Sequence, residues 1–449
     1  MNGRLATDAG AAPVRSEREL RRAASTLAIL LRRALRAGRL IAGGRPRSAV
    51  AARELRRAFE ELGPTYVKFG QIIASSPGLF PDVLSEEFRA CLDSVPPAPI
   101  DEIRRVIVED LGGDPEGLFE DFDLDPLASA SIAQVHAARL KTGEDVVVKV
   151  QRPHIGDRLS ADLRILRRVA RLVALTSTGR MANPVAVVDD FATTLAEELD
   201  FTLEGRYMEE FERNLHAFGN NELVRVPKVH WDHTSPRVLT MERIHGYKID
   251  DWSELVSTGW DLEELLKRGV RAWMEGALVH GLFHGDVHAG NLMVDAAGRV
   301  VFLDFGIMGR LDDHTREVIR RGLPALLING DYQEVAKAVY EMGAILKPRD
   351  LEESSRDIAE IVKPLLGKPL GEISYGEMLV DIIRIGTRYD VRLPRELVLV
   401  SKQMLYFERY AKMAAPDWAI VGDPELISFL FDTSIGGDGP IQPLLGEEA

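Results

Sequence analysis

The chain has 449 residues, of which 45% are hydrophobic and 28% charged, and its formal net charge is −14 at pH 7. This length accommodates two or three domains with sizeable cores, and the single cysteine, Cys91, excludes an internal disulfide and fits a reducing compartment. The acidic balance argues against nucleic acid as the main partner, because most of the surface would repel a phosphate backbone.

The amino-terminal segment is basic although the whole chain is acidic. Residues 1–60 contain 14 arginines, no lysine and five acidic residues, so this segment carries +9 and the remainder −23. Residues 1–16 are small and polar, and we expect them to be disordered. Residues 17–41 place leucines and arginines on opposite faces of a predicted helix. This basic helix either binds an anionic membrane surface or packs its leucines on the protein's own core.

More helices follow before any strand. They are predicted at residues 47–62, 64–75 and 101–111. The breaker Gly63-Pro64 separates the first two, and residues 17–115 are expected to form an all-helical leading domain. No apolar run reaches the roughly 20 residues of a membrane-spanning helix, and no signal peptide is evident. We therefore expect a cytoplasmic protein, at most peripheral at the inner face of the membrane.

A β-rich lobe is predicted over residues 116–246. Its β-branched and aromatic runs predict strands at 119–124, 131–140, 145–151, 224–230 and 237–243. Two helices, 157–176 and 185–215, interrupt these strands. The chain is then mostly helical, so we expect a second lobe over residues 247–435 and a loose tail at 436–449.

Lys149 lies in the middle of a β-branched run, where a lysine is costly unless it is paired. In protein kinases a lysine on such a strand holds the ATP phosphates, and a helix glutamate holds the lysine. Glu204 is the best candidate for that partner. Residues with small side chains replace the usual glycine-rich phosphate loop, so the nucleotide should be held differently here. The candidate nucleotide-binding residues of this loop are Ala128, Ser129, Ala130, Ser131 and Ile132. The adenine base is expected beside Met241, Glu242 and Ile244, between the two lobes.

The segment 284–306 carries the densest chemical signal in the chain. It contains His284-Gly285-Asp286, then Asn291, then Asp304-Phe305-Gly306. Phosphoryl transfer needs a carboxylate near the attacking hydroxyl, which Asp286 supplies. It also needs oxygen ligands that hold Mg²⁺ against ATP, and Asn291 and Asp304 supply these. The spacing predicts a kinase-like phosphotransferase or ATPase that uses ATP and Mg²⁺.

The chain resembles the UbiB-type atypical kinases, also called the aarF-domain or ADCK family. The markers are Lys68-Phe69-Gly70-Gln71 (K-x-G-Q), the alanine-rich loop 128–136, Val148-Lys149-Val150, Glu198-Leu199-Asp200 (E-x-D) and the motifs of segment 284–306. They occur in the family's order, although Ser129 interrupts the alanine run. The resemblance implies an α+β, protein-kinase-like two-lobe fold with an N-terminal helical extension that carries the K-x-G-Q motif.

The resemblance also implies functional assignments. The K-x-G-Q helix 64–75 would cover the active site, with Lys68 and Gln71 gating it and Lys68 contacting Glu198 and Asp200. Family members bind ATP with Mg²⁺, act as ATPases or unorthodox kinases, and often support ubiquinone, menaquinone or other isoprenoid-lipid metabolism. Bacterial members often carry C-terminal transmembrane helices, which this sequence lacks. Contact with an anionic membrane or with quinone intermediates would then rest on the basic helix, a partner protein or a second copy of the chain.

Two other functions fit part of the pattern. A small-molecule phosphotransferase of the aminoglycoside- or choline-kinase type uses the same catalytic motifs but lacks a K-x-G-Q helix. A non-catalytic nucleotide-binding scaffold would keep the fold without turnover. A structural zinc at His284, Asp286 and His288 would need a fourth ligand, and none is near in sequence.

Overall fold

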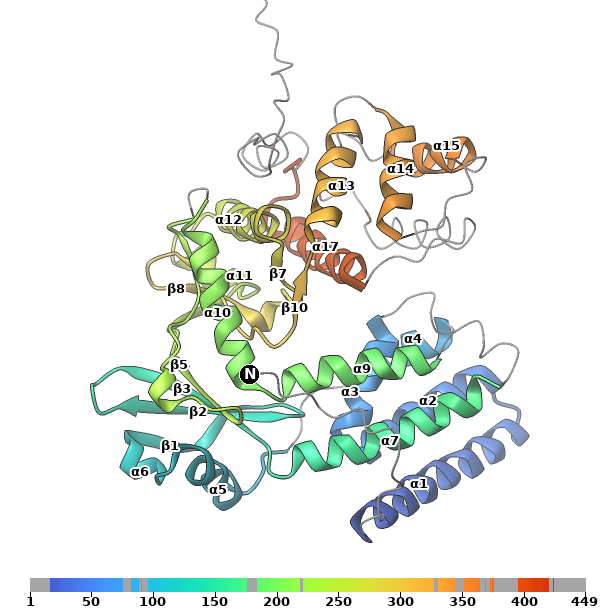
Figure 1. Ribbon diagram of the computed structural model, residues 1–449, viewed down its shortest axis with the longest axis vertical. Helices are drawn as coiled ribbons and strands as arrows, with labels where there is room; N and C mark the ends of the chain where they lie inside the picture. Colours follow the sequence, from blue (N-terminus) through green and yellow to red (C-terminus); the bar gives the residue numbers. More distant parts are fainter. Residues whose placement is uncertain are drawn as a thin grey trace, which may run out of the picture. The chain divides into compact units, whose positions relative to one another are not determined.

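The structure is a computed structural model (Figure 1). It describes residues 17–75, 82–88, 90, 96–175, 184–218, 221–326, 330–343, 351–363, 368, 372, 374, 395–419 and 423. The two predicted tails, 1–16 and 436–449, lie outside these residues. The chain divides into two compact units. Unit 1 comprises residues 1–103, 128–134 and 151–199, and unit 2 comprises residues 104–127, 135–150 and 200–449.

Unit 1 is mainly a helical bundle. Its helices are α1 (Glu17–Ala42), α2 (Arg47–Leu62), α3 (Pro64–Ser75), α4 (Asp82–Phe88), α7 (Ile155–Val173) and α9 (Pro184–Glu198). Gly63 adopts a φ of 94° between α2 and α3, and Pro64 opens α3, because proline suits the first helical turn. Phe59 packs edge-on against Tyr66 and Phe88, with ring centroids 5.5 and 5.0 Å apart. Figure 1 shows α7 between α1 and α9.

Two helices that the sequence assigns to the β-rich lobe pack instead in this bundle. The predicted helix 157–176 is α7. The predicted helix 185–215 is in fact two helices: α9, which lies in this bundle, and α10 (Phe201–Leu215), which belongs to unit 2. The apolar residues of α7 and α9 share one buried core with α2 and α3. Those that α7 and α9 contribute are Ile155, Leu159, Leu166, Ala170, Val188, Phe191 and Leu195. The predicted domain boundaries therefore do not coincide with the compact units.

Helix α1 presents part of its leucine face to solvent. Leu27, Leu31 and Leu35 follow one another at four-residue intervals and are 67, 58 and 57% exposed. Ile29 and Leu30 pack against the core instead. The bundle thus contacts the edge of the leucine face rather than its centre. Three arginines of α1 form ion pairs with acidic residues of α2. Arg32 and Arg33 pair with Glu61, and Arg33 and Arg36 pair with Glu54.

Asp162 of α7 ties α1 and α3 to the bundle. Its buried carboxylate accepts hydrogen bonds from Arg22 Nε at 2.7 Å, Arg22 Nη2 at 2.8 Å and Thr65 Oγ1 at 2.8 Å. Asp162→Asn should lower the free energy of unfolding by about 3 kcal/mol, because a half-buried guanidinium loses its counter-charge. Urea denaturation measures this, with the exposed Asp157→Asn on the same helix as control. Equal losses in the two variants would contradict the assignment.

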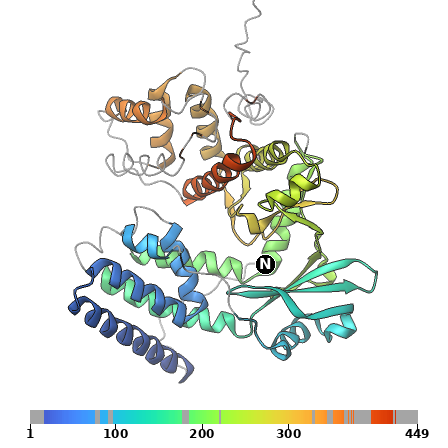
Figure 2. The ribbon, with the colours of Figure 1, turned by 180° about the vertical axis from the view of Figure 1, so that it is seen from behind.

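The main sheet of unit 2 has four strands in the order β1-β2-β3-β5. These strands are β1 (Phe119–Ser129), β2 (Ala133–Leu140), β3 (Asp145–Gln151) and β5 (Val238–Glu242). β3 and β5 run antiparallel, with Lys149 opposite Leu239. Side chains alternate along β3, so Val148 and Val150 are buried on one face and Lys149 emerges on the other. Figure 2 shows α5 (Ile100–Leu111) and α6 (Pro115–Leu118) beside this sheet.

Two smaller sheets position the segment 284–306. Their strands are β7 (Leu282–His284) with β10 (Met308–Arg310), and β4 (Val224–Arg225), β9 (Val300–Phe302), β8 (Leu292–Asp295) and β6 (Gly246–Lys248) in that order. The predicted strand 224–230 is shorter than expected, because Pro227 has no N–H for a ladder hydrogen bond. Asp286 follows β7, Asn291 precedes β8 and Asp304 follows β9. The three candidate residues therefore lie at strand ends.

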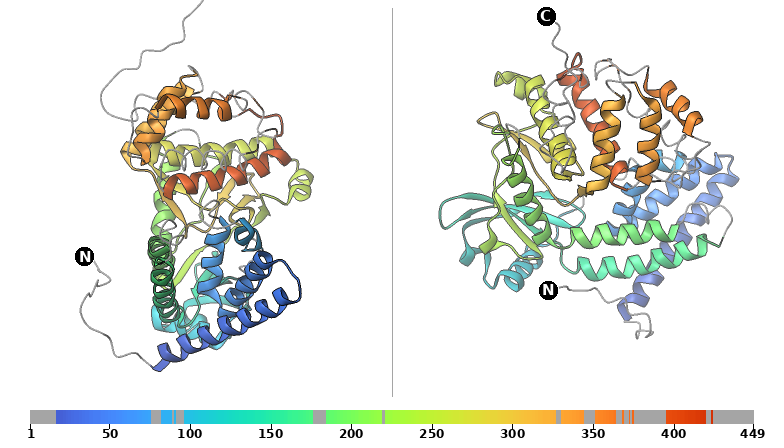
Figure 3. Two further views of the ribbon diagram at one scale, coloured as in Figure 1. Left: turned by 90° about the vertical axis from the view of Figure 1, so that its right-hand side faces the viewer. Right: turned by 45° about the horizontal axis from the view of Figure 1, so that its top comes forward.

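The rest of unit 2 is helical. Its helices and helical turns are η1 (Trp231–His233), α11 (Trp252–Ser257), α12 (Leu262–Glu275), η2 (Gly276–His280), η3 (Ala289–Asn291), α13 (Asp313–Pro324), α14 (Tyr332–Gly343), α15 (Leu351–Val362) and α17 (Arg395–Ala414). Figure 3 shows α17 alongside α12. No helix in the described part of the chain has the length and apolar character to cross a membrane.

Candidate active site

Lys149 lies between two carboxylates in unit 2. Its Nζ is 2.8 and 3.0 Å from the two carboxylate oxygens of Glu204 and 3.0 Å from Asp304 Oδ1. The predicted pairing of Lys149 with Glu204 is therefore present. The Glu204 side chain is 4% exposed, whereas that of Asp304 is 50% exposed. One carboxylate thus holds the ammonium from inside the protein, and the other remains accessible to a ligand.

Burial and the neighbouring charges shift the pKa of both Lys149 and Glu204. Burial alone would lower the pKa of Lys149, but the negative charges of Asp304 and Glu204 outweigh it and raise this pKa, so Lys149 stays protonated. Burial raises the pKa of Glu204 to about 7, while Lys149 opposes the rise and Asp304 adds to it. Two carboxylates around one ammonium leave an excess of negative charge. A cation bound at Asp304 would offset that excess.

Asp304 and Asn291 have oxygen atoms suited to Mg²⁺. Asp304 has a φ of 52°, a left-handed conformation that costs a non-glycine residue roughly 1–2 kcal/mol and that often marks a functional position. Asn291 donates through Nδ2 to the carbonyl of Asp286 at 3.0 Å, which leaves its side-chain oxygen to act as a ligand. Mg²⁺ in nucleotide sites takes one or two protein oxygens and completes its shell with phosphate and water. These residues therefore fit the ion.

A structural zinc does not fit the ring of His284. Its Nε2 is 2.8 Å from the carbonyl oxygen of Leu303, and its Nδ1 accepts a hydrogen bond from the Asp286 N–H at 3.1 Å. Both ring nitrogens are therefore engaged with the protein backbone. Among the described residues, no group of three or more His, Cys, Asp or Glu side chains could hold a metal ion.

Asp286 lies in the loop after β7, and its side chain is 19% exposed. Its Oδ1 accepts a hydrogen bond from Lys402 Nζ at 2.8 Å, and its Oδ2 is 3.6 Å from His288 Nε2. The loop is fixed at Gly285, whose N–H donates to the carbonyl of Ile307 at 2.9 Å. A partly exposed carboxylate on a fixed loop suits a general base.

The predicted phosphate-binding residues lie at the end of β1 and in the loop between β1 and β2. The Ala130 N–H donates to the Ala133 carbonyl at 2.9 Å and closes a tight turn. Arg152 holds this loop, because its Nε donates to Ala130 O at 2.8 Å and its Nη2 to Ser129 Oγ at 2.7 Å. The buried Ser131 hydroxyl has no hydrogen-bond partner within the described part of the chain. Arg152 lies just beyond β3, and no sequence motif indicated it.

The segment expected to meet adenine spans the end of β5, with Met241 and Glu242 in the strand and Ile244 just beyond it. The Glu242 N–H donates to Lys228 O at 2.8 Å, and the Arg243 N–H donates to Asp145 O at 3.0 Å. These two donors are occupied by the protein. A base bound here would have to pair with backbone carbonyls of the segment or with the N–H of Ile244.

The K-x-G-Q motif lies on α3, with Lys68 and Gln71 one turn apart. Lys68 forms an ion pair with Glu198 at the end of α9, and the two side chains are 19 and 11% exposed. This is one of the contacts that the resemblance implies. Asp200 caps α10, because it accepts hydrogen bonds from Thr202 N at 3.0 Å and Thr202 Oγ1 at 2.6 Å. The gating function of these residues stays a prediction.

Comparisons with known proteins identify the family. Residues 90–339 match the ABC1 atypical kinase-like domain and residues 358–419 match the UbiB helical domain. An uncharacterized protein of Mycobacterium tuberculosis is 51% identical over 377 residues, which cover 84% of this chain and 77% of that protein. An uncharacterized chloroplastic aarF domain-containing protein kinase of Arabidopsis thaliana is 36% identical over 397 residues, covering 83 and 73%. A "probable protein kinase UbiB" of Cellvibrio japonicus is 36% identical over 373 residues, covering 81 and 67%. The chain therefore belongs to the UbiB/aarF family of ABC1 atypical kinase-like proteins and has their kinase-like mixed helix-and-sheet fold.

Proposed function

We propose that the protein binds ATP with Mg²⁺ and hydrolyses it or transfers its γ-phosphoryl group. The observation that carries this proposal is the arrangement around Lys149. Its ammonium is bound by the buried carboxylate of Glu204 and also contacts the solvent-accessible carboxylate of Asp304. An ammonium oriented in this way grips nucleotide phosphates in kinase-like proteins, and the adjacent carboxylate serves their metal ion.

Each residue has a separate task in this proposal. Lys149 binds phosphate oxygens, and Glu204 keeps the ammonium in place. Asp286 orients the attacking hydroxyl or water and accepts its proton. Asn291 and Asp304 would hold Mg²⁺, which neutralises phosphate charge when bound. The residues proposed to gate the site are Lys68, Gln71, Glu198 and Asp200.

We further propose that the protein acts at an anionic membrane surface, in support of isoprenoid quinone or lipid metabolism. The exposed stripe Leu27, Leu31 and Leu35 supports this, because it offers apolar side chains on a helix rich in arginine. Membership of the UbiB/aarF family supports this too, because the resemblance to that family implies a role in isoprenoid quinone or lipid metabolism. We accordingly propose a cytoplasmic location that is peripheral to the membrane.

Turnover of Mg-ATP with and without anionic vesicles tests both parts. The intact protein should hydrolyse Mg-ATP, and vesicles should raise the rate severalfold. The variant Leu27→Gln/Leu31→Gln/Leu35→Gln should keep the basal rate and lose the stimulation. This variant is preferable to truncation, because removing α1 would also remove the Arg22–Asp162 contact.

Two controls complete the design. Vesicles of neutral lipid should not stimulate the intact protein, and Val256→Gln, at a 59% exposed position of α11, should respond like the wild type. Absence of turnover under all conditions would remove the enzymatic part of the proposal. Equal turnover with and without vesicles would remove only the membrane part.

A further inference from the structure

Helix α17 holds the loop that carries Asp286, although the two lie more than a hundred residues apart in the sequence. Gln403 is fully buried and contacts the backbone on both sides of Asp286. Its Nε2 donates to Gly285 O at 2.6 Å, and its Oε1 accepts from Val287 N at 2.9 Å. Tyr410 adds a third contact, because its hydroxyl donates to Val287 O at 2.9 Å. The backbone around Asp286 is thus fixed without any help from the Asp286 side chain.

Lys402 of α17 contacts the carboxylate of Asp286 itself. Its Nζ donates to Asp286 Oδ1 at 2.8 Å, and the two side chains are 28 and 19% exposed. The ammonium also lies 5.9 Å from the ring centroid of Tyr406. On the other side of the carboxylate, His288 is 3.6 Å from Oδ2 and 42% exposed. Lys402 therefore provides the short, partly shielded contact, and His288 provides a longer and more open one.

The Lys402 contact serves either the stability of the fold or the orientation of the Asp286 carboxylate. Solvent-exposed ion pairs contribute about 0–1 kcal/mol to stability, and we expect a small contribution from this partly exposed pair as well. The loop is already fixed by Gln403 and Tyr410, so its fold does not depend on Lys402. The orientation of the carboxylate does depend on it, because backbone bonds do not restrict rotation of a side chain. A general base must lie within about 2.6–3.2 Å of the proton it accepts.

Building on the proposed function, we propose that Lys402 is a positioning residue for phosphoryl transfer that acts through Asp286. The lysine holds the carboxylate in the orientation that faces the attacking hydroxyl or water. The C-terminal helical segment thereby completes a catalytic loop whose own sequence motif does not include this lysine. Lys402 touches neither phosphate nor metal in this assignment, so it should affect the chemical step and not nucleotide binding.

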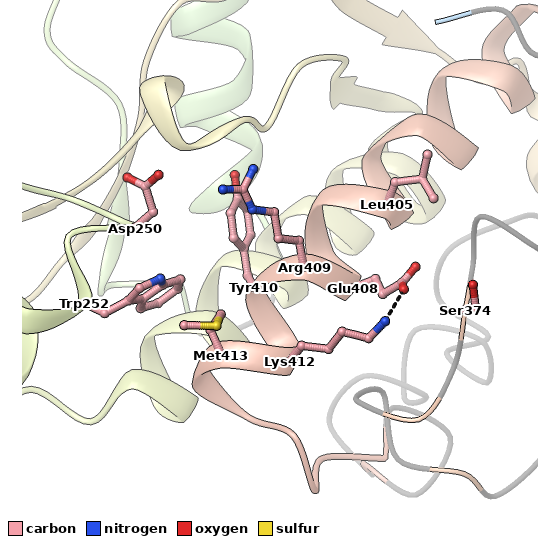
Figure 4. Close-up of a pocket in the computed structure, with 9 residues that line it drawn as sticks. All are labelled: Asp250, Trp252, Ser374, Leu405, Glu408, Arg409, Tyr410, Lys412 and Met413. Carbon is pink, nitrogen blue, oxygen red and sulfur yellow. Dashed lines mark hydrogen bonds and ion pairs between the residues drawn. The ribbon is translucent and has the colours of Figure 1, made fainter. Parts of the chain in front are cut away.

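The main test compares Lys402→Met with Lys412→Met. Lys412 lies on the same helix and pairs with Glu408 at 2.5 Å (Figure 4), at a cavity of about 590 Å³ that is also lined by Trp252. Lys402→Met should lower kcat by about 30- to 100-fold, as expected for a misplaced catalytic group. Its Kd for Mg-ATP, from titration calorimetry, and its melting temperature should match the wild type. Lys412→Met should leave all three quantities unchanged.

Two further variants separate positioning from a general structural effect. Lys402→Arg keeps the charge and the donor, so it should recover kcat to within about tenfold of wild type. In a double-mutant cycle, Asp286→Asn/Lys402→Met should be no slower than Asp286→Asn alone, because residues that act as one unit are strongly non-additive. Radiolabelled ATP makes these low rates measurable.

The outcomes distinguish this proposal from the one on which it rests. If the wild type does not turn over Mg-ATP, the proposed function fails, and the positioning proposal falls with it. If the wild type is active and Lys402→Met is equally active, only the positioning proposal is overturned. Multiplied losses in the double variant, or an equal loss in Lys412→Met, would also overturn it.

Discussion

Asp286→Asn should lower Mg-ATP turnover by about 10²–10⁴-fold, the usual contribution of a general acid–base residue. Asparagine is close in size to aspartate, so the loop contacts of Gln403 and Tyr410 should survive the change. The amide can still meet Lys402, but it can no longer accept a proton from an attacking hydroxyl. Initial rates at saturating Mg-ATP measure the loss, and titration calorimetry should show a Kd within about threefold of wild type, because a group that acts only in the transition state leaves ground-state binding intact.

Asp313→Asn is the matched control for this prediction. Its side chain is 96% exposed at the start of α13, so the same chemical change there should leave turnover unaffected. If Asp286→Asn instead kept wild-type turnover and every other ATP-dependent property, Asp286 would not be the base. The non-catalytic nucleotide-binding scaffold would then be the better account of the protein.

The sequence predicted those parts of the site in which a charged residue lies within a strand or a motif where only its chemical role explains it. A lysine within the β-branched strand β3 needs a partner, and this requirement indicated Glu204, 55 residues away. Asp304 lies 155 residues from Lys149; its motif indicated a metal ligand, and the structure shows its carboxylate in contact with Lys149. Spacing within the motifs likewise indicated Asp286, Asn291 and Asp304 as candidates, and the structure shows all three next to strand ends. The need of a buried lysine for a partner and the spacing within a motif can be read from the sequence without knowledge of the tertiary packing.

The sequence did not predict which apolar residues of α1 are exposed or where the strand that begins at Val224 ends, because these depend on tertiary packing and on a single proline. The arginines and leucines of α1 predicted which residues share a face, but not that Leu27 and Leu31 would stay exposed while Ile29 turned inward. The strand pattern after Val224 also failed, because one proline outweighed the β-branched residues around it. Periodicity records which side chains lie together and carries no information on the neighbour that covers them.

Lys402 and Arg152 could not be predicted from the sequence, for a different reason. Lys402 lies 116 residues from Asp286 on a helix whose residues are ordinary for an amphipathic helix. Arg152 contacts the alanine-rich loop, yet as an arginine at the end of a strand it looks like a solvated residue. A charged side chain on a surface helix or at a strand end has many available partners. Only the tertiary structure selects one of them.

Asp304→Asn should weaken Mg-ATP binding by roughly 100-fold, because it removes a charged ligand from the metal ion. The expected signature is a loss of metal dependence: wild-type affinity for ATP should fall sharply when EDTA replaces Mg²⁺, and the affinity of the variant should not. Asparagine tolerates the left-handed backbone at φ 52°, so the change should not destabilise the fold through strain. Titration calorimetry with and without Mg²⁺ measures the affinities, and thermal unfolding checks the fold.

Asp295→Asn provides the contrast, because Asp295 ends the neighbouring strand β8 and its carboxylate accepts hydrogen bonds from Ala297 N and Arg299 N at 2.9 and 3.0 Å. This carboxylate stabilises a hairpin turn, so its loss should lower the melting temperature while ATP binding stays dependent on Mg²⁺. The two variants should therefore give opposite patterns. Asp304→Asn should keep the melting temperature and lose the Mg²⁺ dependence of ATP binding, whereas Asp295→Asn should lower the melting temperature and keep that dependence. Should Asp304→Asn retain wild-type affinity with the same sensitivity to EDTA, Asp304 would only be a second acceptor for Lys149, and the metal ion would have to be held by other oxygens.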